Sequence, residues 1–362
     1  MPCQRLFRFL ILIFVLFGSA CRPQPLFPVV KIGLVAPFEG RYRAIGYDAI
    51  YAARLAVREI NAGGGVDGRR LALVAYDDRN DPQLARTLAR NLTIDPQVVA
   101  VLGHYRQTTT RAAQAIYAAH GVPLLALSAW PTSTHLIGGQ LLPSPEALAQ
   151  AMVAEAPLAE TGCGTIWGDD VLAQALSETL GERRCVTPEA EPAFALSAAP
   201  AHVTAQRVRD WEGPLIGGPE LSAPDFVHIA GSISVEGTLF ITPYPFPRDL
   251  PGTGAWTAAY TSMGPHVSEP GAYALPTYEA VYLLAEAFAE ALKTHGRLTP
   301  TGVQQTLRAV SRTGALGTIH LDKEGIWSTA PLYLYTWREG EPHLLARQAT
   351  GDRGDEGDIV PW

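Results

Sequence analysis

The sequence predicts an α/β protein of two lobes, each built around a largely parallel sheet. Short apolar runs rich in β-branched residues alternate with amphipathic stretches, the order typical of βαβ units. The series starts again after Leu142-Pro143-Ser144-Pro145. About 340 residues follow the N-terminal segment, which is more than one hydrophobic core usually serves, so two lobes are expected.

The first half of the chain carries the clearest series of elements. Strands are expected at four apolar runs: Val29–Ala36, Leu71–Tyr76, Val98–Leu102 and Val122–Leu127. Helices are expected over Ala49–Ile60 and Gln107–His120. Another helix is expected to begin at Asp81, a natural N-cap, with Pro82 at its first position.

The second half repeats the pattern more weakly. Helices are expected at Glu146–Leu158, Asp170–Leu180, Tyr278–Leu292 and Thr299–Val310. Gly164–Trp167 is an expected strand, and Thr204–Trp211, Leu215-Ile216 and Gly237–Thr242 indicate the remainder of a second sheet with its helices. From Arg183 to Pro200 the periodic signal weakens into Ala and Pro. Gly317–Leu321 and Leu332–Trp337 are predicted to pair as strands through a turn at Asp322–Gly325.

The N-terminus predicts export. Arg5 and Arg8 precede the apolar run Phe9–Phe17, and Gly18-Ser19-Ala20 stand directly before Cys21. Nine apolar residues at about 1.5 Å each are too short to span a membrane, so the pattern indicates a cleaved signal. A Cys after small residues resembles the bacterial lipoprotein signal, although Gly18 stands where Leu is usual.

Residues 1–20 are therefore predicted to be a lipoprotein signal peptide, with Cys21 lipidated. Ordinary secretion and an uncleaved anchor are the alternatives. Residues 21–28 contain three prolines and are predicted to be a tether that holds the folded part off the membrane. The protein is then expected at the outer face of the cell membrane or in the periplasm. No second apolar run of about 18 residues follows.

Composition excludes several kinds of partner. The hydrophobic fraction of 47% and the charged fraction of 17% are typical of packed cores, not of a disordered chain. A net charge of −7 and the lack of any Lys/Arg cluster argue against binding to nucleic acid or anionic lipid surfaces. We expect a monomer.

Nothing in the sequence indicates catalysis. The nine His are scattered without metal-ligand spacing, and there is no nucleophile elbow, phosphate-binding loop or dinucleotide glycine pattern. We expect no catalytic residue, no metal and no cofactor. Export makes a disulfide between Cys163 and Cys185 possible, with two buried free thiols as the alternative, and two cysteines are too few for structural zinc.

One region resembles a known family. Lys31–Pro37, the AVREIN ending of Ala53–Asn61, Gly64–Arg69, Tyr76–Asp78 and Val99–His104 follow one another in an order and spacing similar to those of the leucine/isoleucine/valine-binding proteins of bacterial ABC importers. The resemblance is dense over Val29–Leu127. It is weak between about 160 and 215, and returns at Gly217–Glu220, Tyr278–Leu292 and Gly317–Gly325.

The resemblance implies the type I periplasmic-binding fold, in which two Rossmann-like lobes with parallel sheets are joined by a three-stranded hinge. The chain would cross between lobes near Leu141–Pro145, Thr242–Pro247 and Gly314–Leu321. Lobe 1 would comprise residues 29–142 and 246–315, and lobe 2 residues 143–245 and 316–345, followed by a tail at 346–362. The implied partners are a small ligand held between the lobes and an ABC permease and ATPase.

The resemblance also points to ligand groups in lobe 1. Gln107 stands where the family has a ligand-binding Ser, with Thr108 beside it, and helix starts of this kind favour anions. Thr108 could instead be only the N-cap. Ser128 and Ala129 fit the family pattern, but Trp130 replaces a Thr that meets the ligand, so a smaller and more aromatic pocket is expected if Trp130 lines it.

In lobe 2, Glu220 matches a family residue that pairs with the ligand's ammonium group. The alternative for Glu220 is an exposed loop carboxylate. Tyr105 and Tyr244 are weaker candidates for the cleft wall. The expected ligand is an amino acid or a related small amphoteric or amide compound, and Gln107 and Trp130 put a branched aliphatic amino acid in doubt. The alternative function is a ligand-sensing or regulatory envelope lipoprotein of the same fold.

Overall fold

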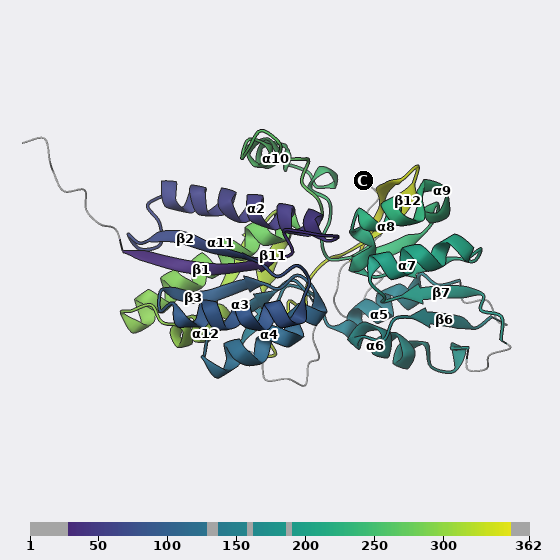
Figure 1. The fold of residues 1–362 in the computed structure, drawn as a ribbon, viewed down its shortest axis with the longest axis horizontal. Coiled ribbons are helices and arrows are strands. Elements are labelled where there is room, and N and C mark those ends of the chain that lie inside the picture. The colour runs from purple at the N-terminus through teal and green to yellow at the C-terminus, as the bar shows by residue number, and fades with distance from the viewer. Residues whose placement is uncertain (1–27, 129–136, 158–161, 186–189, 349–362) are drawn as a thin grey trace, which may run out of the picture.

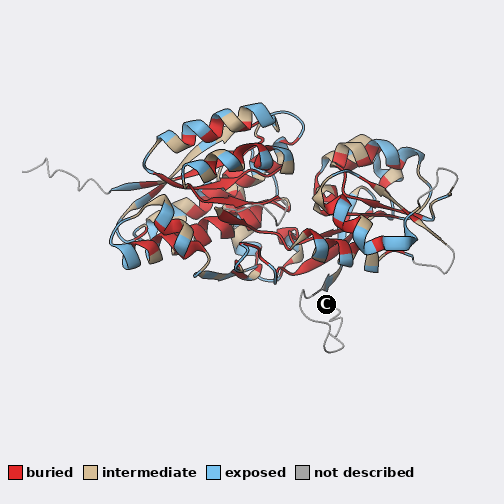
Figure 2. Cartoon of the chain, turned by 90° about the horizontal axis from the view of Figure 1, so that it is seen from below, coloured by how far each residue is buried: buried red, intermediate tan, exposed pale blue. Residues whose placement is uncertain are grey.

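The computed structural model describes residues 28–128, 137–157, 162–185 and 190–348. They form two α/β lobes that lie side by side along the long axis of the molecule (Figure 1). Buried residues concentrate in the sheets of both lobes, and exposed residues lie on the outer faces of the helices (Figure 2). The predicted fold class, two lobes with largely parallel sheets, is confirmed.

The sheet of lobe 1 has five parallel strands in the order β2-β1-β3-β4-β5. Their bounds are Val29–Ala36 for β1, Arg70–Asp77 for β2, Val98–Gly103 for β3, Leu124–Ala126 for β4 and Gly138–Gln140 for β5. Every residue of β3 is buried, as expected for a central parallel strand covered on both faces. The first four strands were predicted, whereas β5, only three residues long and glycine-rich, was not.

Helices cover both faces of this sheet (Figure 1). They are α2 (Arg43–Ala62), α3 (Pro82–Ile94), α4 (Gln107–Ala119), α11 (Ala274–His295) and α12 (Pro300–Leu307). A further helix, α10 (Gly254–Thr261), packs on the outer side of α2 (Figure 1). On one face Leu34 packs with residues of α2 and α11, and on the other Val35 packs with residues of α3 and α4. Asp81 caps α3 as predicted, because its Oδ1 accepts from the backbone N–H of Gln83 at 2.7 Å.

The sheet of lobe 2 has six strands in the order β13-β12-β9-β8-β7-β6. Four are parallel: β6 (Gly164–Trp167), β7 (Phe194–Ser197), β8 (Leu215–Gly217) and β9 (Leu239–Thr242). The other two, β12 (Leu332–Arg338) and β13 (Glu341–Gln348), are antiparallel. The helices of this lobe are α5 (Pro145–Ala154), α6 (Val171–Leu180), α7 (Ala201–Arg207), α8 (Asp225–Ala230) and α9 (Ser232–Val235).

The predicted pairing of the two C-terminal runs is wrong. β11 (Gly317–His320) pairs with β10 (Ser311–Gly314) in a local hairpin, and β12 pairs with β9 and β13. A hairpin closed over two residues needs far less ordering of the chain than a pairing across residues 321–331. Neither β10 nor β13 was predicted. Most of β10 is polar, and β13 mixes charged and apolar residues at the edge of its sheet.

Three segments connect the sheets of the two lobes. They follow β5, β9 and β11, at residues 141–144, 243–246 and 321–331. Hydrogen bonds join these connections to one another and to the neighbouring strands. Tyr244 Oη donates to the Leu141 carbonyl at 2.8 Å, and the N–H of Gln140 donates to the Gly325 carbonyl at 2.8 Å. The connections therefore form one bonded hinge, and the third lies just after the expected stretch 314–321.

A disulfide joins Cys163 and Cys185 across 22 positions of the sequence. The backbone N–H of Cys185 also donates to the carbonyl of Gly164, the first residue of β6, at 3.0 Å. A loop of this size, once cross-linked, stabilises a fold by about 3 kcal/mol because it restricts the unfolded chain. In the described part of the chain, no helix has both the length and the apolar character needed to span a bilayer.

Candidate functional site

A small cavity of about 50 Å³ lies between the lobes, where the strands of both sheets end. Lobe 1 contributes residues that follow β3, β4 and β5 and one before α11: Tyr105, Gln107, Leu127, Ser128, Leu142 and Tyr273. Lobe 2 contributes residues from α5 and from the ends of β6, β7 and β8: Leu148, Asp170, Leu172, Ala198, Gly218, Pro219 and Glu220. The carboxyl edge of a parallel sheet is where α/β proteins usually hold ligands.

Glycine makes the turn into the site possible. Gly103, the last residue of β3, has φ of 120°, and a Cβ there would lie 2.2 Å from the Val35 carbonyl oxygen. Only glycine tolerates this conformation and this approach. The chain turns here so that Tyr105 and Gln107 face the cavity from the start of α4.

Gln107 supplies an unused donor. It is the first residue of α4, and its Nε2 is buried without a hydrogen-bond partner among the described residues. A buried amide left unpaired costs about 1–3 kcal/mol, so such a group indicates a ligand or water that completes it. Ser128 lines the same cavity, with its Oγ 2.6 Å from Thr110 Oγ1. Both residues were predicted, and the structure places both in the cavity wall.

Thr108 is not a cavity residue. It is exposed, and its hydroxyl donates to Asn80 Oδ1 at 3.4 Å. Nor is it the N-cap of α4, which is Arg106. Ala129 and Trp130 lie outside the described residues, as does Cys21, so the expectations for them stay predictions.

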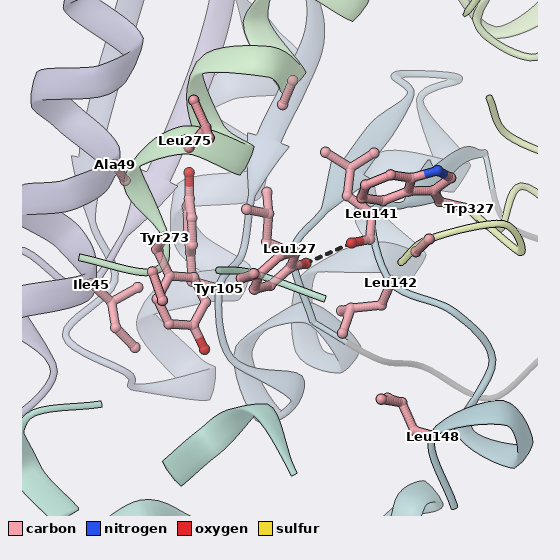
Figure 3. Close-up of a cluster of buried hydrophobic side chains, with 14 of the residues drawn as sticks. Ile45, Ala49, Tyr105, Leu127, Leu141, Leu142, Leu148, Tyr273, Leu275 and Trp327 are labelled. Carbon is pink, nitrogen blue, oxygen red and sulfur yellow. Dashed lines mark hydrogen bonds between the residues drawn. The ribbon is translucent and has the colours of Figure 1, made fainter. Parts of the chain in front are cut away.

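Aromatic and aliphatic side chains form the remaining wall. Tyr105, Tyr273, Leu127, Leu142 and Leu148 come together from both lobes (Figure 3). Tyr105 Oη lies 2.9 Å from Thr277 Oγ1, and burial raises the pKa of this phenol well above its ordinary value, so it stays neutral. Tyr244, a candidate for the cleft wall, does not line the cavity; its hydroxyl donates a hydrogen bond to Leu141 within the hinge.

Glu220 lines the cavity, but it already has a cationic partner in the protein. Arg106 Nη1 donates to Glu220 Oε2, which links the two lobes. The guanidinium lies over the ring of Tyr42, 4.2 Å from its centroid. Tyr42 Oη in turn lies 2.9 Å from His202 Nδ1, a second link between the lobes. Sequence reasoning missed Arg106, because nothing local shows which way its long side chain reaches.

Asp170 is a second carboxyl group of the cavity. It caps α6, with Oδ1 accepting from the N–H of Ala173 at 2.9 Å. Burial raises the pKa of this carboxyl above its usual range, and the backbone bonds from Ala173 and Leu172 oppose that rise. Its acceptor atoms are thus directed mainly to the helix start.

Asp48 supports the site from behind. Its Oδ1 accepts from the N–H of Gly271 at 3.0 Å and its Oδ2 from the N–H of Tyr273 at 3.2 Å, so it fixes the segment that carries Tyr273 into the cavity. Asp48 also lines a larger hollow of about 540 Å³ that both lobes wall, with Ser222, Ala223 and Pro224 contributed by lobe 2. Burial raises the pKa of Asp48 to about 7, in spite of those two bonds.

The protein should lose stability as pH rises through 7. Because burial raises the pKa of Asp48 from 3.8 to about 7 in the folded state, the stability that its protonated form contributes is fully present below about pH 4 and is lost as pH rises to about 7. Between pH 6 and 8 the loss from this group amounts to about 1.4 kcal/mol. Denaturant titration of the wild type and of Asp48→Asn measures it. Equal slopes of unfolding free energy against pH in both proteins would contradict the assignment.

Comparison with known proteins agrees with this geometry. Residues 29–162 match the family model described as periplasmic binding protein. The Leu/Ile/Val-binding protein homolog 1 of Brucella melitensis is 26% identical over 353 residues, covering 86% of this chain and 91% of that protein. The Leu/Ile/Val-binding protein of Escherichia coli K12 is 31% identical over 113 residues, which span 30% of that protein.

Among solved structures, the substrate-binding protein LivJ of a Streptococcus pneumoniae branched-chain amino acid transporter, in complex with isoleucine, superposes with a TM-score of 0.73. It is 21% identical and covers 89% of this chain and 99% of its own. Fold and cleft together define a two-lobed protein of the type I periplasmic-binding fold. Within that class the chain is similar to the leucine/isoleucine/valine-binding proteins, as the sequence predicted.

Proposed function

We propose that this chain is an exported lipoprotein that captures a small ligand of the amino-acid kind between its lobes for an ABC importer. The ligand would be an amino acid or a related small amphoteric or amide compound. The observation that carries the proposal is the cavity between the strand ends of the two lobes, with the unpaired amide of Gln107 in its wall. The relatives are solute-binding proteins, so the proposed activity is binding, not catalysis.

The polar side of the cavity suits a carboxylate or an amide carbonyl. Gln107 Nε2 is a free donor, and the N–H groups in the first turn of α4 have no partner within the helix. Ser128 adds a hydroxyl. Donors at a helix start favour negative charge, so one carboxylate oxygen can accept from several groups at once.

The hinge allows the lobes to move about the ligand. Three short connections join the sheets, and each lobe supplies part of the cavity wall. Closure of two such lobes brings donors from both onto one ligand and removes water from around it. An importer could then distinguish the closed protein from the open one.

A ligand screen tests the proposal. Thermal unfolding of the mature protein would be followed against amino acids, amides and short carboxylates, with calorimetry for each compound that raises the melting temperature. Because a ligand at about 100 times its Kd stabilises the folded state by about 2.7 kcal/mol, a rise of several degrees is expected. A protein that responds to none of these classes would contradict solute capture.

The lipid anchor has its own test. Replacing Cys21 by Ala in a native host should leave the protein unprocessed or without lipid, because lipid is attached at that thiol. Mass spectrometry of the mature N-terminus and membrane fractionation measure the outcome. A wild-type mature form that is soluble and carries no lipid mass on Cys21 would show ordinary secretion instead.

A further inference from the structure

The ion pair across the cleft has a built environment. Arg106 is 5% exposed and lies in lobe 1 directly before α4, whereas Glu220 lies in lobe 2 after β8. Besides its bond to Glu220, Arg106 donates through Nη2 to Tyr42 Oη at 3.4 Å and stacks on that ring. Stacking and two directed bonds hold the guanidinium in place better than an exposed pair would be held.

We propose that Arg106 occupies the place of a ligand ammonium group, so that the cleft selects a small carboxylate without an α-amino group. This inference rests on the proposed capture of a small ligand between the lobes. Within that function it names the ligand class: a deaminated acid with an aliphatic or aromatic body. It assigns Arg106 as the residue that sets this preference.

The charges around the cavity support the assignment. Glu220 is the acidic group that an ammonium would need, and Arg106 already neutralises it. An ammonium entering beside Glu220 would meet the guanidinium, and juxtaposed like charges are an effective way to reject a ligand. The other carboxyl in the wall, Asp170, accepts backbone N–H groups at the start of α6.

The unpaired polar atom of the cavity wall is a donor. Among the described residues that line the cavity, Gln107 Nε2 is buried without a hydrogen-bond partner. An unpaired buried donor calls for an acceptor, which a carboxylate supplies and an ammonium does not. Around Gln107 most of the wall is apolar: Leu127, Leu142, Leu148, Leu172, Tyr105 and Tyr273 offer contacts to a hydrocarbon or phenyl body.

Matched pairs of ligands test the inference. Calorimetry would compare leucine with 4-methylpentanoate and phenylalanine with 3-phenylpropanoate, which differ only by the amino group. We expect wild type to bind the deaminated member at least about tenfold more tightly. Arg106→Ala should shift the ratio of Kd values toward the amino acid by a similar factor, because it frees Glu220. Arg106→Lys, which keeps the cation, should retain the wild-type order.

The outcomes separate the two proposals. Tighter wild-type binding of the amino acids, or an unchanged ratio in folded Arg106→Ala, overturns the role of Arg106 and leaves ligand capture standing. If none of the four compounds and no member of the broader screen binds, capture itself fails and the inference fails with it.

If Arg106→Ala does not fold, the Glu220→Gln variant tests the role of Arg106 instead. The Glu220 side chain is 27% exposed, and its amide replacement keeps the shape. A loss of at least about tenfold confined to the amino acids would mean that Glu220 holds their ammonium, against the inference. Equal effects on both members of each pair would uphold it.

Discussion

Replacing Glu279 by Ala is expected to lower the free energy of unfolding by about 3–5 kcal/mol. Glu279 lies in α11 and is 2% exposed. Its Oε2 accepts from Arg312 Nε at 2.8 Å and its Oε1 from the N–H of Ala315 at 3.1 Å. The substitution leaves the partly buried Arg312 and a backbone donor without their partner, which costs more than the pair itself contributes.

Arg312 also has a weaker partner, which supplies a matched control. Glu286 lies 3.5 Å from Arg312 Nη1, and its side chain is 37% exposed. Because water screens such a pair, Glu286→Ala should cost less than about 1 kcal/mol. Denaturant unfolding of both variants measures the difference. Similar losses in the two would mean that the buried pair does not hold the β10–β11 hairpin against α11.

Replacing Gln107 by Leu is expected to weaken ligand binding by roughly ten- to a hundredfold. The change keeps the approximate size of the side chain and removes the donor that has no partner within the described part of the protein. Calorimetry with the tightest compound from the screen measures the loss. The fold should persist, because no protein group among the described residues depends on that amide nitrogen.

Thr108→Val is the control for Gln107. Thr108 is the next residue of the same helix, but it is exposed and does not line the cavity. Its substitution should leave the Kd within about twofold, since surface changes away from a site cost little. If Thr108→Val weakens binding as much as Gln107→Leu, the carboxylate site lies on the outer side of α4 and not in the cavity.

Lobe 1 was largely predictable because its signals are local. Strands such as β3 are continuous apolar runs, and the start of α3 is indicated by Asp81 as its N-cap and Pro82 as its first residue. These residues determine their own secondary structure, and the βαβ order then leaves a parallel sheet as the natural outcome. The same order placed Gln107 and Ser128 at strand ends, where the cavity lies.

The parts that escaped prediction depend on distant residues. β7 is a four-residue strand in an Ala- and Pro-rich stretch, and only pairing with β6 and β8 makes it a strand. β13 is defined by its ladder with β12. The Arg106–Glu220 pair joins residues 114 positions apart, so the sequence indicated a free Glu220 where the structure shows an occupied one.

Hydrogen exchange with and without ligand tests most directly whether a solute is held between the lobes. The tightest compound from the screen would be added at saturation, and amide exchange followed by mass spectrometry. Capture between the lobes predicts slower exchange at both walls together: residues 105–110 of lobe 1 and residues 217–222 of lobe 2. Protection confined to one lobe, or found only away from the cavity, would contradict the account.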